Sequence, residues 1–175
     1  MRVEIRIAGT GGMGVVLAGV VMGHAAVVHA GLDAVQTQSY GSEARGTDAK
    51  SEVIISDQPI RYPKVLKADY SVLMSQKAFD AYVDGAKKDS VIIIDPDLVS
   101  YSDGDADHSI VPVKAMSIAD SLGQRMISNM VMLGALVKKS EVFPLETLEK
   151  AVIDMLPAKV QALNLQAVRA GSAQV

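Results

Sequence analysis

The sequence predicts one α/β domain in which a mostly parallel sheet is covered by helices on both faces. Three observations lead to this prediction. Strand-like and helix-like stretches alternate along most of the chain, a glycine-rich loop follows the first strand, and the core residues are aliphatic rather than aromatic. Of the 175 residues 49% are hydrophobic, yet there are two Phe and no Trp. A chain of this length builds one core, so residues 1–175 are expected to form a single domain.

The predicted elements follow one another in a simple order. Short apolar runs predict strands at 3–7, 33–37, 53–55, 72–74, 91–94 and 110–113. Helical patterns predict helices at 14–30, 79–86, 118–122, 126–139, 145–156 and 159–170. Strands that alternate with helices form right-handed βαβ units, which gives a Rossmann-like three-layer domain. The last helices have no strands between them, so we expect a helical C-terminal part. The polar segment 38–50 is expected to be a loop.

Charge and cysteine content exclude several classes of function. The net charge is −3 without a basic cluster, so neither nucleic acid nor a membrane is an expected partner. The chain has no Cys, which excludes disulfides, thiolate zinc sites and an ordinary iron–sulfur cluster bound by this chain itself. The first residues form a strand pattern and lack the features of a signal peptide, so a cytoplasmic location is expected.

The first motif is the glycine loop Gly9-Thr10-Gly11-Gly12-Met13-Gly14, which satisfies G-x-G-x-x-G between a strand and a helix. Such a loop either cradles the pyrophosphate of a dinucleotide or allows close packing and contact with a partner. The acidic residue that would hold the ribose is missing, because the second strand ends in Gln and Ser and Asp33 stands at its other end. The sequence therefore favours a close-packing and docking turn.

The helix predicted after the glycine loop is apolar on every side, with six Val residues and one Leu between positions 15 and 28. A helix that flanks a sheet in a monomer normally shows water a polar stripe. Two explanations remain open. Either other helices of this domain bury it, or a partner subunit covers it.

The second motif lies in the polar segment, where S-Y-G-x-E-x-R-G spans residues 39–46. A V-I-I-S strand at 53–56 and a P-x-V-x-x-A-D step at 63–69 follow, and Asn129, Leu133-Gly134-Ala135 and Asn164…Ala167…Gly171 come later. In this order and spacing, the chain resembles the gamma subunit of 2-oxoacid:ferredoxin oxidoreductases. Within the family, the 2-oxoglutarate branch is the most similar in the segments 38–41, 44–46 and 51–56, which read Q-S-Y-G, A-R-G and S-E-V-I-I-S, with pyruvate, 2-oxoisovalerate and indolepyruvate enzymes as alternatives. Met13 and Thr47 depart from the usual Gln and Gly of the family.

The resemblance implies an enzyme that decarboxylates a 2-oxoacid on thiamine diphosphate, passes electrons through iron–sulfur clusters to ferredoxin and transfers the acyl group to coenzyme A. Thiamine diphosphate, magnesium and the clusters would lie on partner subunits, alpha and beta with delta as a further candidate. This chain would hold no cofactor alone and no catalytic residue. Its expected contacts to coenzyme A or to a subunit are Gly9, Gly11, Gly12, Gly14, Ser39, Tyr40, Gly41, Glu43, Arg45 and Gly46.

No metal site is expected in this chain. Asp103, Asp105 and Asp107 are spaced like the start of a calcium loop, but His108 and Lys114 replace the glycine and the bidentate glutamate that the loop needs. His24 and His29 are five residues apart, which places them on different faces of an α-helix, so they are interpreted as buried or interface histidines.

Asp95-Pro96-Asp97 follows an interior strand and fits either a ligand at the sheet edge or a turn. Two rival functions also stay open from the sequence. One is a stand-alone oxidoreductase that binds NAD(P) or a flavin. The other is an assembly protein whose loops touch neither substrate nor coenzyme.

Overall fold

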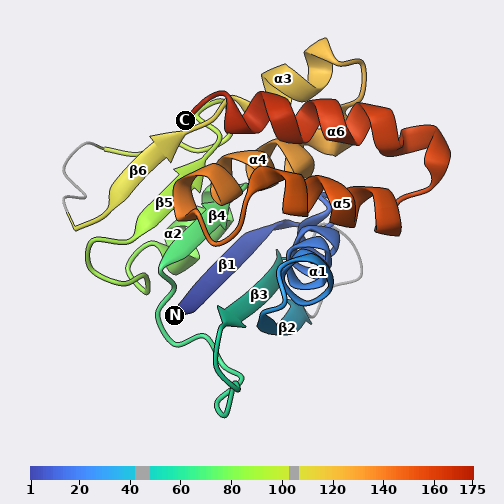
Figure 1. Cartoon of the computed structure of the whole chain (residues 1–175). Coiled ribbons are helices and arrows are strands. Elements are labelled where there is room, and N and C mark those ends of the chain that lie inside the picture. The colour runs from blue at the N-terminus through green and yellow to red at the C-terminus, as the bar shows by residue number, and fades with distance from the viewer. Residues whose placement is uncertain (42–47, 103–106) are drawn as a thin grey trace.

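The computed structural model describes residues 1–41, 48–102 and 107–175. In these ranges six strands form one sheet, with helices on both faces (Figure 1). The strands are β1 (Arg2–Thr10), β2 (Asp33–Tyr40), β3 (Asp48–Ser56), β4 (Tyr70–Leu73), β5 (Val91–Ile94) and β6 (Ser109–Pro112). The helices are α1 (Val15–His24), α2 (Gln76–Tyr82), α3 (Ala115–Ser121), α4 (Ser128–Ser140), α5 (Leu145–Met155) and α6 (Ala158–Ser172). A π-helical turn, η1 (Ala25–His29), continues α1, and a 3-10 turn, η2 (Arg125–Ile127), precedes α4.

The sheet has the strand order β2-β3-β1-β4-β5-β6. Strands β4, β5 and β6 run parallel to β1, whereas β3 is antiparallel to both of its neighbours, β1 and β2. All strands except β3 therefore point the same way, which confirms the predicted α/β class with a mostly parallel sheet. The carboxyl ends of these parallel strands meet at one edge, and the glycine loop lies at that edge.

The two strands before and after the polar segment are longer than the sequence predicts. A loop is expected over 38–50, but β2 continues to Tyr40, which pairs with Ala49, and β3 already begins at Asp48. Strand β2 lies at the edge of the sheet, where polar side chains can face solvent while the backbone still pairs with β3. Polar composition alone therefore does not end these strands.

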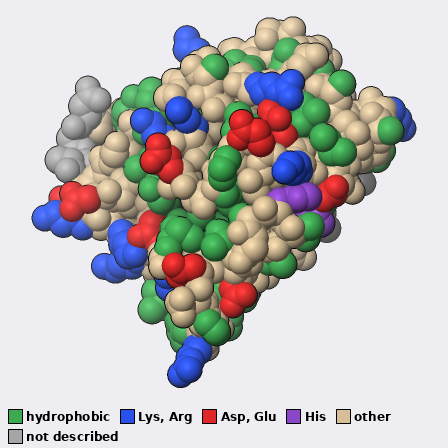
Figure 2. Space-filling view, viewed as in Figure 1, with side chains coloured by type: hydrophobic (Ala, Val, Ile, Leu, Met, Phe, Trp, Pro, Cys, Tyr) green, Lys and Arg blue, Asp and Glu red, His purple; other side chains and the backbone are tan. Residues whose placement is uncertain are grey.

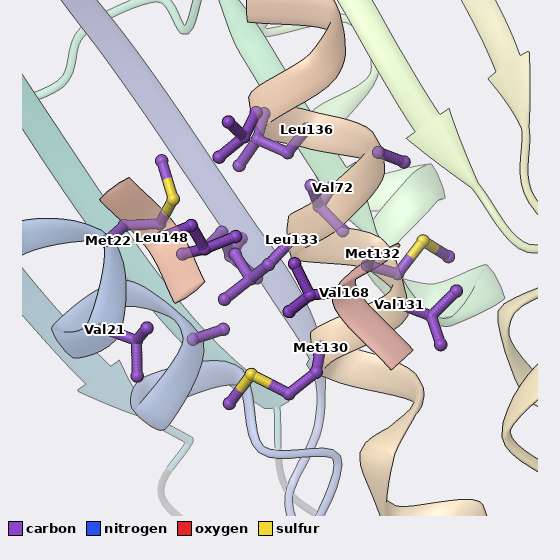
Figure 3. Close-up of a cluster of buried hydrophobic side chains, with 14 of the residues drawn as sticks. Val21, Met22, Val72, Met130, Val131, Met132, Leu133, Leu136, Leu148 and Val168 are labelled. Atoms are coloured by element: carbon purple, nitrogen blue, oxygen red, sulfur yellow. The ribbon is translucent and has the colours of Figure 1, made fainter. Parts of the chain in front are cut away.

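One face of the sheet carries the main core, between α1, α4 and α5. Figure 3 shows side chains from these helices, from α6 and from β4 meeting there. The labelled residues are Val21, Met22, Val72, Met130, Val131, Met132, Leu133, Leu136, Leu148 and Val168. Helix α4 is buried at every position from Ser128 to Val137, because the sheet lies on one side of it and α6 packs on the other (Figure 1). Helix α6 thus adds a layer outside α4. With α4 and α5 it forms the helical C-terminal part that the sequence predicts.

Helix α2 covers the opposite face with a smaller apolar cluster. Beside this cluster lies a buried cation, Arg6 of β1. Its Nε donates to a Glu52 carboxylate oxygen at 2.8 Å, and its guanidinium lies 5.0 Å from the centre of the Tyr82 ring. A buried charge requires partners of this kind. The contacts join the end of α2 to β1 and β3.

Two glycines allow α4 and α6 to cross in backbone contact. A Cβ atom added to Gly134 would overlap the Val168 carbonyl oxygen, and one added to Gly171 would overlap the Val131 carbonyl oxygen. Neither obstacle is a flexible side chain that could turn away. The spacing between the two helices therefore depends on glycine at both positions.

Replacing Gly171 with Ala is expected to lower the free energy of unfolding by about 1–3 kcal/mol, because the added methyl group must push α6 away from α4. Urea unfolding followed by circular dichroism measures this change. The matched control is Gly23→Ala in α1, where the nearest atom to an added Cβ is at 3.9 Å and the gain in helix propensity is expected to leave stability unchanged or raised. If Gly171→Ala and the unmodified chain unfold at the same urea concentration, the proposed role of Gly171 in helix packing is contradicted.

Candidate functional site

The glycine loop joins the carboxyl end of β1 to α1. Gly12 has a φ of 91° and Gly14 a φ of 70°, both in the left-handed region that favours glycine. Gly14 directly precedes α1, and its carbonyl oxygen accepts a hydrogen bond from the Ala18 amide at 3.0 Å. Gly11 and Gly12 are exposed. The tip of the loop therefore presents backbone without side chains to the surroundings.

The outer glycines of the loop are in close internal contact. A Cβ added to Gly9 would lie 3.1 Å from Met13 Sδ and 3.2 Å from Met74 Cβ. One added to Gly14 would lie 2.9 Å from Asn129 Cγ. The Asn129 side chain is buried at the beginning of α4, and its Nδ2 donates to the Gly14 carbonyl oxygen at 3.1 Å. The loop is thereby fixed to α4 as well as to β1.

The described residues lack the parts that complete a dinucleotide site. In the nucleotide-binding arrangement the second strand neighbours the first and supplies the acid for the ribose, but here β3 lies between β1 and β2. The pair of Thr10 and Asp48 lies at the end of the sheet next to the loop. Asp33 pairs with Ser56 at the opposite end. In addition, the Thr10 amide donates to Met13 Sδ at 3.4 Å. This arrangement disfavours the stand-alone NAD(P) or flavin enzyme.

The sheet register brings the second motif to the same edge as the glycine loop. Thr10 pairs with Asp48 of β3, and the neighbouring Ala49 pairs with Tyr40 of β2. The Gly41 amide donates to the Asp48 carbonyl oxygen at 2.7 Å and closes the described part of the hairpin. Ser39, Tyr40 and Gly41 are exposed. Two motifs that are about thirty residues apart in the sequence thus border one surface.

Helix α2 begins at this surface too. Its Ser75 Oγ caps the helix by accepting the Ala78 amide at 3.1 Å, and Lys77 Nζ lies 3.0 Å from an Asp48 carboxylate oxygen. We call this surface the glycine-loop edge; it consists of Gly11, Gly12, Ser39, Tyr40, Gly41, Asp48 and Lys77. Three further predicted contact residues, Glu43, Arg45 and Gly46, lie in 42–47, outside the described residues.

Asp95, at the carboxyl end of β5, serves the fold. Its side chain is buried, and both carboxylate oxygens accept backbone hydrogen bonds, from the Asp97 amide at 2.9 Å and from the Met116 amide at 2.7 Å. Asp97 in turn accepts from Ser117 Oγ at 2.8 Å. These bonds form the turn after β5 and hold the first residues of α3. Of the two interpretations of this motif, the contacts support the turn.

Helix α1 is only partly covered by the rest of the domain. Helix α5 packs against it, but Leu17, Val27 and Val28 keep 38%, 51% and 56% of their surface exposed. Val20, Val27 and Val28 also line a shallow groove against Ala34 of β2. We call these residues the α1 strip: Leu17, Val20, Val27 and Val28. No described helix is long and apolar enough to cross a membrane.

The sequence interpretation of His24 and His29 is wrong in one respect. They lie side by side, with ring centres 5.8 Å apart, because the chain changes from α-helix to the π-helical turn η1 between them. Both Nε2 atoms contact the same Asp154 carboxylate oxygen, at 3.0 and 2.6 Å. Hydrogen bonds from His24 and His29 hold the pKa of the Asp154 carboxyl below its usual range. Figure 2 shows histidine side chains at the surface where α1 meets α5.

The sequence pattern predicts one continuous α-helix over 14–30, which would separate the two histidines, so the cluster is not evident from it. Nothing in the pattern links Asp154 to them, since it lies about 125 residues further along the chain. The spacing of five between the two histidines is the one signal in the sequence, and it indicates a common face only on a π-helical turn.

Residues 4–174 match the protein family described as pyruvate ferredoxin/flavodoxin oxidoreductase. The chain belongs to this family. A curated relative, the 2-oxoglutarate synthase subunit KorC of Methanocaldococcus jannaschii, is 44% identical over 173 residues, which are 98% of this chain and 92% of the relative. The match spans both the sheet and the helical C-terminal part.

Two solved structures share the fold. The gamma subunit of a keto/oxoacid ferredoxin oxidoreductase from Geobacter sulfurreducens has a TM-score of 0.89 and 36% identity, over 99% of this chain and 96% of that chain. The 2-oxoglutarate:ferredoxin oxidoreductase from Magnetococcus marinus, with 2-oxoglutarate, coenzyme A and succinyl-CoA bound, has a TM-score of 0.88 and 25% identity, over 99% of this chain and 31% of that chain. In the second protein the matching part is therefore one region of a longer polypeptide.

These comparisons confirm the predicted family, a gamma subunit of a 2-oxoacid:ferredoxin oxidoreductase. They also confirm that the chain is a component of an oxidoreductase whose catalysis takes place in the complex. Partner subunits follow from this membership.

Proposed function

We propose that this chain is the gamma subunit of a coenzyme A-dependent 2-oxoglutarate:ferredoxin oxidoreductase. The observation that supports 2-oxoglutarate as the substrate is the 44% identity, over nearly the whole chain, to a 2-oxoglutarate synthase subunit. The S-Y-G-x-E-x-R-G motif of residues 39–46 also supports the 2-oxoglutarate branch of the family. The complex would convert 2-oxoglutarate and coenzyme A to succinyl-CoA and carbon dioxide, with two electrons passing to ferredoxin.

This subunit supplies surfaces rather than reaction chemistry. The chain has no Cys, so it offers no thiolates for an iron–sulfur cluster. In the glycine loop, the place where a pyrophosphate group would be expected, Met13 Sδ already takes the Thr10 amide. These residues do not fit clusters or thiamine diphosphate with its magnesium. We assign those groups to partner subunits, alpha and beta with delta as a further candidate, and no catalytic residue to this chain.

The proposed contact surface for the catalytic subunits is the glycine-loop edge together with 42–47. Exposed backbone at Gly11 and Gly12 allows another chain to approach closely, since no side chain stands in the way. The exposed Tyr40 supplies a rigid aromatic contact of the kind enriched at interfaces. The α1 strip is apolar, and it is a second surface that a partner subunit would cover.

Arg45 is the residue to which we assign coenzyme A. An arginine can bind phosphate groups through two parallel hydrogen bonds, and it stays charged at all physiological pH values. In the sequence it lies between β2 and β3, whose described ends meet at the glycine-loop edge beside Gly41. The entrance for coenzyme A would then lie between this hairpin and a catalytic subunit.

A second candidate is a pure assembly subunit. The observation that favours it is internal: Gly9 and Gly14 are both used for packing within the domain, against Met74 and Asn129. On this view the motifs preserve the fold of the subunit and touch no coenzyme. The two candidates differ in what they predict for Arg45.

The complex purified from its native host through a tag on this chain is expected to contain partner subunits and to reduce ferredoxin with 2-oxoglutarate and coenzyme A. Its kcat/KM for 2-oxoglutarate should exceed that for pyruvate by about tenfold or more, since the binding pocket must discriminate side chains of different size and charge. A panel of 2-oxoacids measures the preference. If the chain purifies alone, the subunit assignment fails; if another oxoacid is preferred, the substrate assignment fails.

In the same complex, Arg45→Ala is expected to raise the KM for coenzyme A by about tenfold while the subunits stay together, because a charge-assisted contact to phosphate is lost. The matched control is Arg61→Ala. It removes the same charge from an exposed position near Tyr62, whose carbonyl oxygen accepts from Arg2 at the opposite edge of the sheet. An unchanged KM in Arg45→Ala would support the assembly subunit instead.

A further inference from the structure

The end of α1 has an unusual backbone. Between Ala25 and His29 the helix widens to a π-helical turn, and the Ala30 amide donates to the Ala25 carbonyl oxygen, five residues back, at 3.1 Å. In an α-helix, positions five apart are about 140° apart around the axis. In a π-helical turn the hydrogen bonds join residues five apart, which brings such positions toward one face, and these turns are frequent at functional sites. The turn therefore places His24 and His29 on one face.

Helix α5 adds a third side chain from a distant part of the sequence. Asp154 stands in its last turn, and one of its oxygens lies 3.0 Å from His24 Nε2 and 2.6 Å from His29 Nε2. One potential donor atom from each of the three residues lies within 4.8 Å of the others. The side chains are 29%, 20% and 42% exposed, so ions in solution can reach them.

Two imidazoles and one carboxylate form a ligand set that suits divalent transition metals, Zn²⁺ above all. With metal–ligand bonds of 2.0–2.1 Å in a tetrahedral site, the ligand atoms lie about 3.3 Å apart. The two N–O distances here, 3.0 and 2.6 Å, need to lengthen by about 0.3 and 0.7 Å. The two imidazole nitrogens, which lie within 4.8 Å of each other, have to take up the same spacing, and side-chain rotation provides changes of this size. In the part of the chain that the structure describes, no other group of three His, Asp or Glu side chains meets the same distance condition.

We propose that His24, His29 and Asp154 bind one Zn²⁺ ion and that this ion links the π-helical turn of α1 to α5. Zinc binding requires that the ligating imidazole nitrogens carry no proton and that the carboxylate is ionised, so the ion would take the place of the hydrogen bonds between the histidines and Asp154. Three protein ligands leave a fourth position for water. The ion would hold α1 in place directly beside the α1 strip, which includes Val27 and Val28 of η1. This inference does not depend on the proposed substrate or on coenzyme A.

Zinc titration of the full-length chain, after treatment with a chelator, tests the proposal. Isothermal calorimetry near neutral pH is expected to give one Zn²⁺ per chain, and Zn²⁺ is expected to raise the thermal unfolding midpoint by mass action. His29→Gln and Asp154→Asn should each weaken binding on the order of 100-fold, because one of three ligands is lost. The matched control is His108→Ala, since His108 contacts Ser90 and the Lys87 carbonyl oxygen instead.

A second measurement needs no variant. Co²⁺ added to the unmodified chain is expected to produce the visible absorption of a four-coordinate site, and Zn²⁺ should abolish this absorption. This result keeps the test decisive even where circular dichroism shows that a variant does not fold. The proposal is overturned if the unmodified chain binds no Zn²⁺, if folded His29→Gln and Asp154→Asn bind it as tightly as the unmodified chain, or if His108→Ala abolishes binding.

Discussion

The burial of α4 is the constraint on which the rest of the domain depends. This helix packs on the sheet with one side and on α6 with the other, and ten successive residues from Ser128 to Val137 are buried. Such packing leaves no space for a side chain where backbones cross, which explains glycine at 134 and 171. Asn129, the second residue of the same helix, donates a hydrogen bond from its side-chain amide to the Gly14 carbonyl oxygen. The core thus fixes the loop at which we place the contacts with other subunits.

The glycines of the loop consequently have two different roles. Gly9 and Gly14 serve contacts inside the domain, whereas Gly11 and Gly12 face outwards. A dinucleotide-binding loop uses similar glycines to leave its amides open to pyrophosphate. Here a methionine sulfur occupies one of those amides, and β3 separates the loop from the strand that would bind the ribose. The motif alone therefore indicates the local turn but not the ligand.

Much of the fold could be predicted from local pattern, and the errors have physical causes. The buried strand at 91–94 and the final helices are evident from β-branched runs and helical periodicity. The direction of β3 could not be read from its own residues, because antiparallel pairing depends on how short the connection to β2 is. The sequence predicts a longer connection than the structure has, since polar residues such as Gln38 and Lys50 continue the strands at an exposed edge. The contact between His24 and His29 cannot be predicted because a π-helical turn has no clear sequence signal.

We propose that the glycine-loop edge is the surface through which this subunit meets its catalytic partners. Hydrogen–deuterium exchange of the purified complex, compared with the isolated full-length chain, tests it most directly. In the complex, the amides of 9–14, 39–41 and 48–49 are expected to exchange at least about tenfold more slowly than in the isolated chain. The amides of 57–62, at the opposite edge, are expected to exchange at the same rate in both samples. Equal exchange at the glycine-loop edge in both samples would contradict the claim.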